Sequence, residues 1–289
     1  MTTKNPEEQR KITFNGLTAK EWASLSNNVW RGLSSSRSKT YLKHGATFPQ
    51  KLIERIITMY SRSGDLIFDP FLGTGITLLA VRQLNRQGIG IELNPEFVKI
   101  ANEQLSQKSL DNFTNQIPDI QIYHDDCRNM LKYVKPNSVQ LLVTSPPYAN
   151  FIQKSLKDRE ITHKKSKIVI DNKSTVKQYS DDERDFGNYD YSIFLKELKT
   201  VLEKCYQVTK NKGYNIWIVK DYRNTKKGVP YVDFHSDLAH LGQDVGFKYH
   251  DLVIWDQGEQ RKLILLGYPS VFYTNQNCSF LVIFRKVDK

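Results

Sequence analysis

Cysteine is scarce in this chain of 289 residues: only Cys127, Cys205 and Cys278 are present. They lie far apart and show none of the short spacings that are typical of a metal site. An odd number of cysteines also argues against a framework of disulfides. We therefore expect no bound metal, and we expect a protein of the reducing cytoplasm.

Long apolar runs and an acidic surplus are also missing. No apolar run approaches the roughly 20 residues of a membrane-spanning helix. Residues 1–11 contain no apolar segment of the kind found in secretory signals. We therefore expect no membrane association. Basic residues are in excess, with 42 Lys and Arg against 31 Asp and Glu and a formal net charge of +11. This charge favours a polyanionic partner such as nucleic acid, although solubility alone would also explain it.

What the chain does contain is a repeated strand–helix pattern. With 39% hydrophobic residues it can build a large core. Apolar runs typical of buried strands alternate with helical periodicity, which predicts an α/β fold with a doubly wound, mostly parallel sheet. Seven strands are expected, at 66–68, 88–92, 120–124, 139–144, 214–219, 248–255 and 279–286, the last two as a hairpin-like pair. Helices are expected at 49–62, 76–86, from about 95, at 191–208 and at 232–245, and a turn is expected at 211–213.

We expect a single domain over residues 1–289 with three additions. Residues 1–44 form a polar N-terminal arm, and two insertions, 149–190 and 256–277, interrupt the strand–helix pattern. The first insertion is basic, since residues 151–180 carry eight Lys and Arg against three Asp and Glu. A loop of this length is usually functional or disordered. It is either a clamp on a nucleic-acid backbone or a solvated lysine-rich loop.

The stretch 69–75, Asp-Pro-Phe-Leu-Gly-Thr-Gly, lies between a predicted strand and a predicted helix. Its glycines let a ligand approach the backbone, and the helix start offers free N–H groups. The next strand ends in Glu92, about 20 residues on, which is the spacing of a ribose-binding acid. Glu92 could instead cap the following helix, and Asp126 could hold a base amine or be an N-cap. Together these features predict a site for a nucleoside-containing cofactor.

The apolar stretch 139–144 leads directly into Ser145-Pro146-Pro147-Tyr148. Two prolines stop a strand because each fixes φ and removes a backbone donor. The result is a rigid turn at the carboxyl end of a buried strand, where open α/β sheets bind ligands. The turn presents a hydroxyl, a fixed carbonyl and an aromatic ring. On its own, it could also be a simple strand end with Tyr148 as a packing residue.

Taken in order, these motifs resemble the DNA amino-methyltransferases that use S-adenosylmethionine, the N4-cytosine and N6-adenine methylases of bacterial restriction-modification systems. The resemblance is carried by residues 44–57, 68–81, 89–97, 124–128 and 144–148 and extends from about residue 12 to the end. It implies a Rossmann-like methyltransferase fold with S-adenosylmethionine as the cofactor. It also implies double-stranded DNA as the substrate and, in a restriction-modification system, a cognate endonuclease as a partner.

The resemblance further implies roles for individual residues. The methionine part of the cofactor would be held by Phe48, Pro49, Asp69, Phe71, Gly73, Gly75 and Thr77. Glu92 would bind the ribose and Asp126 the adenine. A flipped target base would be taken by Ser145, Pro146, Pro147 and Tyr148. Family members with Ser-Pro-Pro-Tyr mostly methylate N4 of cytosine and those with Asp-Pro-Pro-Tyr mostly N6 of adenine. We therefore expect cytosine N4, with adenine N6 as the alternative.

The insertions are the expected DNA-recognition segments, 149–190 first and 256–277 second. Candidate DNA-binding residues in the first insertion are Lys154, Lys157, Arg159, Lys164, Lys165 and Lys167. Two other classes of function stay open. One is a methyltransferase that acts on RNA or on a protein amide. The other is a non-catalytic nucleic-acid-binding module that keeps the fold, against which the acids Glu92 and Asp126 argue.

Overall fold

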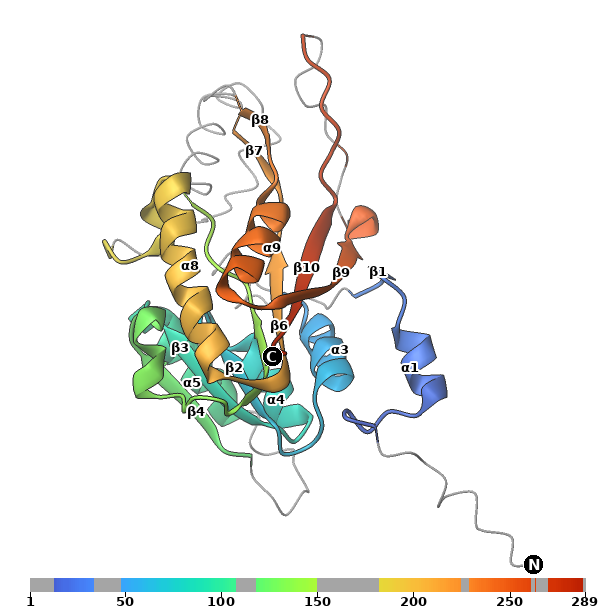
Figure 1. The fold of residues 1–289 in the computed structure, drawn as a ribbon, viewed down its shortest axis with the longest axis vertical. Coiled ribbons are helices and arrows are strands. Elements are labelled where there is room, and N and C mark those ends of the chain that lie inside the picture. Colours follow the sequence, from blue (N-terminus) through green and yellow to red (C-terminus); the bar gives the residue numbers. More distant parts are fainter. Residues whose placement is uncertain are drawn as a thin grey trace, which may run out of the picture.

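A single eight-stranded sheet forms the centre of the computed structural model (Figure 1). The structure describes residues 13–33, 48–107, 118–149, 182–224, 229–260, 263 and 270–287. In spatial order the strands are β1 (Val29–Trp30), β9 (Lys248–Asp256), β10 (Cys278–Arg285), β6 (Thr209–Val219), β5 (Val139–Thr144), β2 (Leu66–Asp69), β3 (Gln87–Glu92) and β4 (Ile120–His124). All neighbouring pairs are parallel except the two that involve β10. The expected mostly parallel α/β sheet is thereby confirmed.

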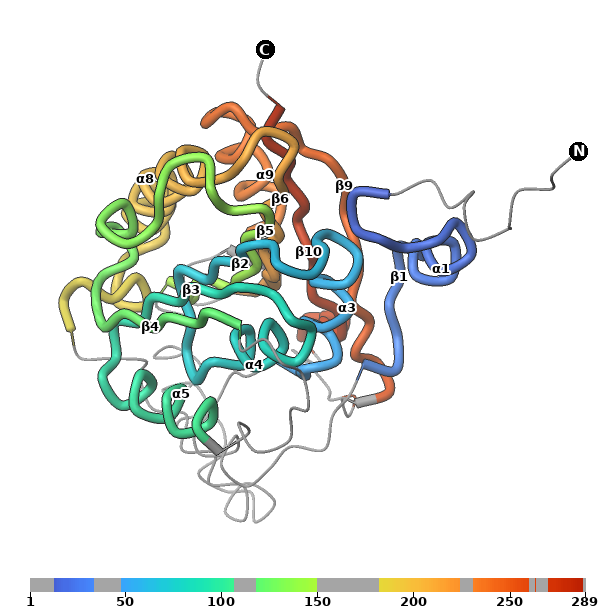
Figure 2. The backbone as a smooth tube through the Cα atoms, turned by 90° about the horizontal axis from the view of Figure 1, so that it is seen from below, coloured from blue at the N-terminus to red at the C-terminus, as the bar shows by residue number. Residues whose placement is uncertain are grey.

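Helices cover both faces of this sheet, as Figure 2 shows from below. One face carries α8 (Tyr191–Val208) and α9 (Phe234–Val245), and the other carries α3 (Gln50–Tyr60), α4 (Ile76–Gln83) and α5 (Pro95–Gln107). Helices α3, α8 and α9 are amphipathic and bury one stripe each, whereas α4 buries all of residues 76–81. A sheet with two apolar faces needs such cover on both. No helix in the described ranges combines the length and the apolar character that crossing a bilayer requires.

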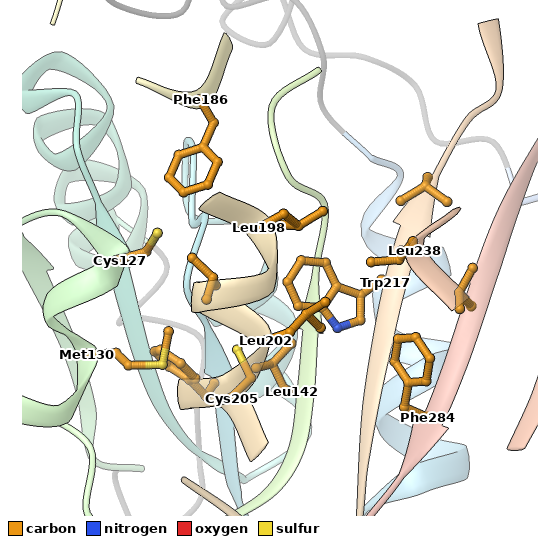
Figure 3. Close-up of a cluster of buried hydrophobic side chains, with 14 of the residues drawn as sticks. Cys127, Met130, Leu142, Phe186, Leu198, Leu202, Cys205, Trp217, Leu238 and Phe284 are labelled. Carbon is orange, nitrogen blue, oxygen red and sulfur yellow. The ribbon is translucent and has the colours of Figure 1, made fainter. Parts of the chain in front are cut away.

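The two cores follow from the alternation of side chains along each strand. On the α8 side, Leu142 of β5 and Trp217 of β6 pack with Leu202 and Cys205 (Figure 3). On the α3 side, the neighbouring residue Val143 points into the other core with Ile216 and Ile218 of β6. Strand β5 is buried on both faces, so its end is fixed firmly in the middle of the sheet.

Several expectations about single elements are wrong. The main sheet has eight strands rather than seven, because β1 pairs with β9 and buries Trp30. Residues 209–213 are not a separate turn, since β6 begins at Thr209, which pairs with Val139. A small second sheet, formed by β7 (Tyr222–Asn224) and β8 (Val229–Val232), was not expected. Helix α4 ends at Gln83, three residues before the expected Arg86.

Candidate active site

The glycine loop, residues 69–75, joins β2 to α4 at the carboxyl edge of the sheet. Gly73 and Gly75 both have positive φ, +56° and +89°, a conformation that glycine adopts without strain. The loop is tied to the next strand, because the Leu72 N–H donates to the Ile91 carbonyl at 3.0 Å. The expected strand, loop and helix start are therefore present as one unit.

Asp69 connects this loop to the end of β5, where the proline turn begins. Its Oδ1 accepts a 2.6 Å hydrogen bond from the Thr144 hydroxyl and a 3.0 Å bond from the Phe71 N–H. Its Oδ2 accepts a 2.6 Å bond from the Thr77 hydroxyl. The side chain is buried, and burial raises the pKa of its carboxyl group to about 6, against the effect of these hydrogen bonds. Asp69 and Thr77 thus bind each other, and Asp69 positions the turn that begins after Thr144.

Glu92 connects the same loop to the end of β3. Its Oε2 accepts a 2.7 Å bond from the Gly73 N–H, and its Oε1 accepts a 2.8 Å bond from the Asn94 N–H. The alternative role for Glu92, capping the following helix, is taken by Asn94, whose Oδ1 accepts from the Glu96 N–H at 2.9 Å. Burial raises the pKa of the Glu92 carboxyl group to about 7, and the nearby Asp69 and Asp185 raise it further.

If Glu92 binds the ribose as predicted, its raised pKa should make cofactor affinity dependent on pH. A carboxylate that accepts ribose hydroxyls loses acceptor capacity when it is protonated. The dissociation constant for S-adenosylmethionine should be constant above about pH 8 and rise about tenfold per pH unit below about pH 6. Glu92→Gln should bind more weakly at pH 8, and its dissociation constant should rise less steeply as the pH falls than that of the wild-type protein. Isothermal titration calorimetry measures both, and a flat profile for the wild-type protein would contradict the role of Glu92.

Asp126 acts as an N-cap, one of the two roles considered for it. Its Oδ1 accepts from the Arg128 N–H at 2.8 Å, at the start of η3 (Cys127–Lys132). The Arg128 guanidinium also pairs with Asp126 Oδ2 at 2.6 Å and with Glu197 at 2.6 Å. Hydrogen bonding to Asp126 is the main reason why the pKa of Arg128 is raised. The adenine-binding role of Asp126 stays a prediction.

The turn 145–148 follows β5 directly, at the edge where the glycine loop lies. Pro146 is buried, while Ser145, Pro147 and Tyr148 are partly exposed. The Tyr148 ring packs edge-on against Phe234 of α9, with ring centroids 6.0 Å apart. Burial of Pro146 and packing of the Tyr148 ring fix the turn, which positions Ser145 and the Pro146 carbonyl.

Phe48 and Pro49 lie at the start of α3, where Pro49 is the N-cap residue. The Phe48 ring packs against Trp255 of β9, with centroids 6.1 Å apart. These residues are not joined to the glycine loop by any hydrogen bond within the described ranges. Their cofactor role stays a prediction.

Thr74 is a site residue that was not singled out from the sequence. Its side chain is buried, yet within the described part of the chain its hydroxyl has no hydrogen-bond partner. A buried polar atom without a partner is costly and indicates that a ligand or water satisfies it. With the positive-φ glycines and the Glu92 carboxylate, it fits a cofactor that carries hydroxyl and amine groups. In the sequence, a site role for Thr74 is indicated only by its position within the motif 69–75.

Gly75 is required by close packing as well as by its backbone angle. A Cβ there would lie 2.8 Å from the Ala101 Cβ and 3.1 Å from its Cα. Gly75→Ala should lower the free energy of unfolding by about 2–4 kcal/mol, from left-handed strain plus overpacking. Gly64→Ala is the control, since φ is +82° there but the space is open, so only about 1–2 kcal/mol is expected. Equal losses in urea unfolding would show that contact with α5 is unimportant.

Only parts of the two predicted DNA-recognition segments belong to the described residues. The candidate DNA-binding residues Lys154, Lys157, Arg159, Lys164, Lys165 and Lys167 are outside the described residues. The end of the first insertion, 182–190, packs near Arg128, whose Nη2 donates to the Arg184 carbonyl at 3.1 Å. In the second insertion, the Tyr273 ring lies 4.9 Å from the Arg223 guanidinium of β7. The described residues directly before β10 rise beyond the end of β6 (Figure 1).

One side-chain cluster near the site could hold a cation on composition alone. Asp221, Asp233 and His235 place possible ligand atoms within 4.8 Å of one another. His235 Nδ1 lies 2.8 Å from Asp221 and 2.9 Å from Asp233, and Asp221 also accepts from the Tyr231 hydroxyl at 2.8 Å. These contacts give each of the three side chains a hydrogen-bond partner within the protein. They attach β8 and the start of α9 to the end of β6.

The strand order, with antiparallel β10 between β6 and β9, and the glycine loop beside the proline turn define a Rossmann-like methyltransferase domain. A family model described as DNA methylase matches residues 2–103 and 139–288. The chain therefore belongs to the DNA methylase family. Membership confirms the resemblance drawn from the motifs, together with the S-adenosylmethionine that it implied as cofactor.

Individual relatives match over shorter stretches. The orphan methyltransferase M.BamHII of Bacillus amyloliquefaciens is 42% identical over 82 residues, 27% of this chain and 31% of that protein. The Type II methyltransferase M.HpaI of Haemophilus parainfluenzae is 34% identical over 120 residues, 37% of each chain. The chain thus aligns with about a third of the length of these curated relatives.

Among solved structures, one match is an S-adenosylmethionine-dependent methyltransferase from Methanosarcina mazei. It is 14% identical, with a TM-score of 0.48 over 81% of this chain and 98% of that one. A putative DNA modification methylase of Thermus thermophilus, in complex with S-adenosyl-L-methionine, is 19% identical, with a TM-score of 0.36 over 56% of this chain and 53% of that one.

Proposed function

We propose that this chain transfers the methyl group of S-adenosylmethionine to the exocyclic N4 amine of a cytosine flipped out of a specific duplex DNA sequence. The observation that carries the proposal is the hydrogen-bonded series Thr144–Asp69–Thr77. It holds the turn that would receive the base beside the loop that would hold the cofactor. The two reactants would thus be positioned by one buried carboxylate.

The cofactor half is supported by the acids and glycines at the ends of β2 and β3. Glu92 would accept hydrogen bonds from ribose hydroxyls, since each of its oxygens uses only one bond to the backbone. Gly73 and Gly75 let the cofactor approach the loop. When bound there, S-adenosylmethionine supplies an electrophilic methyl group.

The base half explains why a serine and a proline carbonyl stand side by side. An exocyclic amine is a weak nucleophile, because its lone pair is delocalised into the ring. Acceptors at Ser145 Oγ and the Pro146 carbonyl would take its two N–H groups and localise that pair. Both acceptors are fixed before the reaction, so little reorganisation is needed. Positioning of the amine in line with the methyl group would supply much of the rate.

The identity of the base is proposed from Ser145. Relatives that methylate adenine mostly carry aspartate at this position, and here a neutral hydroxyl is present. The base has to leave the duplex because its amine cannot be reached within the stack. Tyr148 would then stack on it, a contact worth roughly 1–3 kcal/mol per base.

DNA as the substrate is supported by family membership and by the formal charge of +11. The insertions 149–190 and 256–277 are proposed to contact the duplex, because each leaves the sheet at the edge where the turn lies. Relatives named as Type II methyltransferases support a restriction-modification context, and so a cognate endonuclease as a functional partner.

The test is to incubate the purified chain with duplex DNA of varied sequence and S-adenosylmethionine, digest the DNA and analyse the nucleosides by mass spectrometry. We expect 4-methylcytosine; 6-methyladenine alone would assign the alternative base. Label in RNA only, removed by ribonuclease, would overturn DNA as the substrate. Cofactor binding without any methylated nucleoside, on DNA that carries many sequence contexts, would favour the non-catalytic module.

A further inference from the structure

The end of the first insertion, residues 182–189, closes over the cofactor side of the sheet. The Phe186 ring lies 5.5 Å from the ring of Phe71 in the glycine loop and 5.2 Å from the Arg128 guanidinium. Phe186 is buried and contributes to the core above α8 (Figure 3). Asp185 lies between Phe186 and the Arg184 carbonyl that Arg128 holds, so its position is fixed from both sides.

Asp185 is a buried acid with only one hydrogen bond. It is 5% exposed, and its Oδ1 accepts a 2.8 Å bond from the Gly187 N–H, which caps η4 (Phe186–Asn188). In the described ranges, its other oxygen has no hydrogen-bond or ion-pair partner. Burial raises the pKa of Asp185 to about 6. The other oxygen is not one of the fully enclosed side-chain atoms that lack a partner, so it stays accessible to a ligand. A positively charged ligand group beside it would stabilise the ionised carboxylate.

Two other acids of the site, Asp69 and Glu92, also have no positively charged partner among the described residues. Asp69 and Glu92 are hydrogen-bonded only to hydroxyl and backbone N–H groups, which carry no charge. The Arg128 guanidinium, which lies over the Phe186 ring, pairs with Asp126 and Glu197. The Arg184 side chain pairs with Asp182 at 2.6 Å and is more than half exposed. The described protein thus supplies no cation to Asp69, Glu92 or Asp185.

We propose that Asp185 is a further cofactor-binding residue, whose carboxylate compensates the positive charge of the sulfonium group of S-adenosylmethionine. The inference rests on the proposed function, which places that cofactor beside Phe71 and Glu92. The product, S-adenosylhomocysteine, carries a neutral thioether in place of the sulfonium. Asp185 therefore favours the methyl donor over the product, and its loss should reduce this preference.

The experiment compares Asp185→Asn with Asp182→Asn by titrating both ligands into each purified variant in a calorimeter. Asparagine keeps the acceptor oxygen for the Gly187 N–H, so the local fold is retained. We expect Asp185→Asn to raise the dissociation constant for S-adenosylmethionine about tenfold and that for S-adenosylhomocysteine less than about twofold. Asp182→Asn removes a neighbouring acid of the same segment, and both constants should stay within about twofold.

Each outcome decides a separate question. If Asp185→Asn keeps the wild-type ratio of the two constants, with both weakened or neither, Asp185 is a structural cap and the inference is wrong. If Asp182→Asn changes the ratio of the two dissociation constants as much as Asp185→Asn does, a general effect of surface charge is responsible and the inference is also wrong. If the wild-type protein binds neither ligand, the proposed function itself fails. Thermal unfolding of each variant shows whether it is folded.

Discussion

Replacement of Ser145 by alanine is expected to lower kcat about a hundredfold or more, with the dissociation constant for S-adenosylmethionine changed less than about twofold. The hydroxyl would contact the target amine and not the cofactor. In the proposed reaction it would act when the lone pair of the amine localises, so its loss should affect the chemical step. Single-turnover methylation of duplex DNA, with cofactor affinity measured separately, distinguishes the two effects.

A matched control exists at the other end of the same strand. Ser138 precedes β5, and its hydroxyl donates to the Lys135 carbonyl at 2.6 Å, far along the strand from the turn. Ser138→Ala should leave kcat unchanged. An unchanged single-turnover rate for Ser145→Ala, or an equal loss of cofactor affinity, would show that the amine is not activated at this hydroxyl.

Asp69→Ala should lower the free energy of unfolding by about 2–4 kcal/mol and weaken methylation strongly. Its removal leaves the Thr77 and Thr144 hydroxyls and the Phe71 N–H without the acceptor that they share. Thr144→Val removes only the link to the catalytic turn. It should reduce kcat while S-adenosylmethionine still binds, whereas Asp69→Ala should reduce both.

Two further measurements test the role of Asp69. In a double-mutant cycle, the losses from Asp69→Ala and Thr144→Val should add to more than the loss in the combined variant, because the two residues contact each other. Because the folded pKa of Asp69 is about 6, above its ordinary 3.8, wild-type stability should fall as pH rises between these values and level off above them. Additive losses in the cycle would contradict the link.

The sequence predicts the bounds of two strands well, β5 in the buried centre of the sheet and β4 at its partly buried edge. The bounds of β4 and β5 agree with expectation, since an apolar run ends sharply there at acids or prolines. Strand β1 has two residues, too few for any periodicity, and exists through its pairing with β9. The start of β6 resembles a turn because of Lys212 and Gly213, but pairing of Thr209 with Val139 overrides that local preference.

In the site, too, features formed by consecutive residues can be predicted from the sequence, and contacts between distant residues cannot. The glycine loop, Glu92 and the proline turn are motifs of consecutive residues, so they can be read directly. The partners of Asp69 and Arg128 cannot, because Thr144 and Glu197 are 75 and 69 residues away along the chain. Asp185 has no motif around it. Its importance depends on burial and on neighbours that only folding brings together.

The contact between Asp69 and Thr144 has a consequence for how the chain can be connected. It joins the two halves of the site through side chains, across adjacent parallel strands β2 and β5. The order in which the two loops occur along the polypeptide therefore does not affect their relative placement. A circularly permuted chain, opened in an exposed connection between these strands and closed elsewhere, should keep the same arrangement of serine, glycine loop and acids.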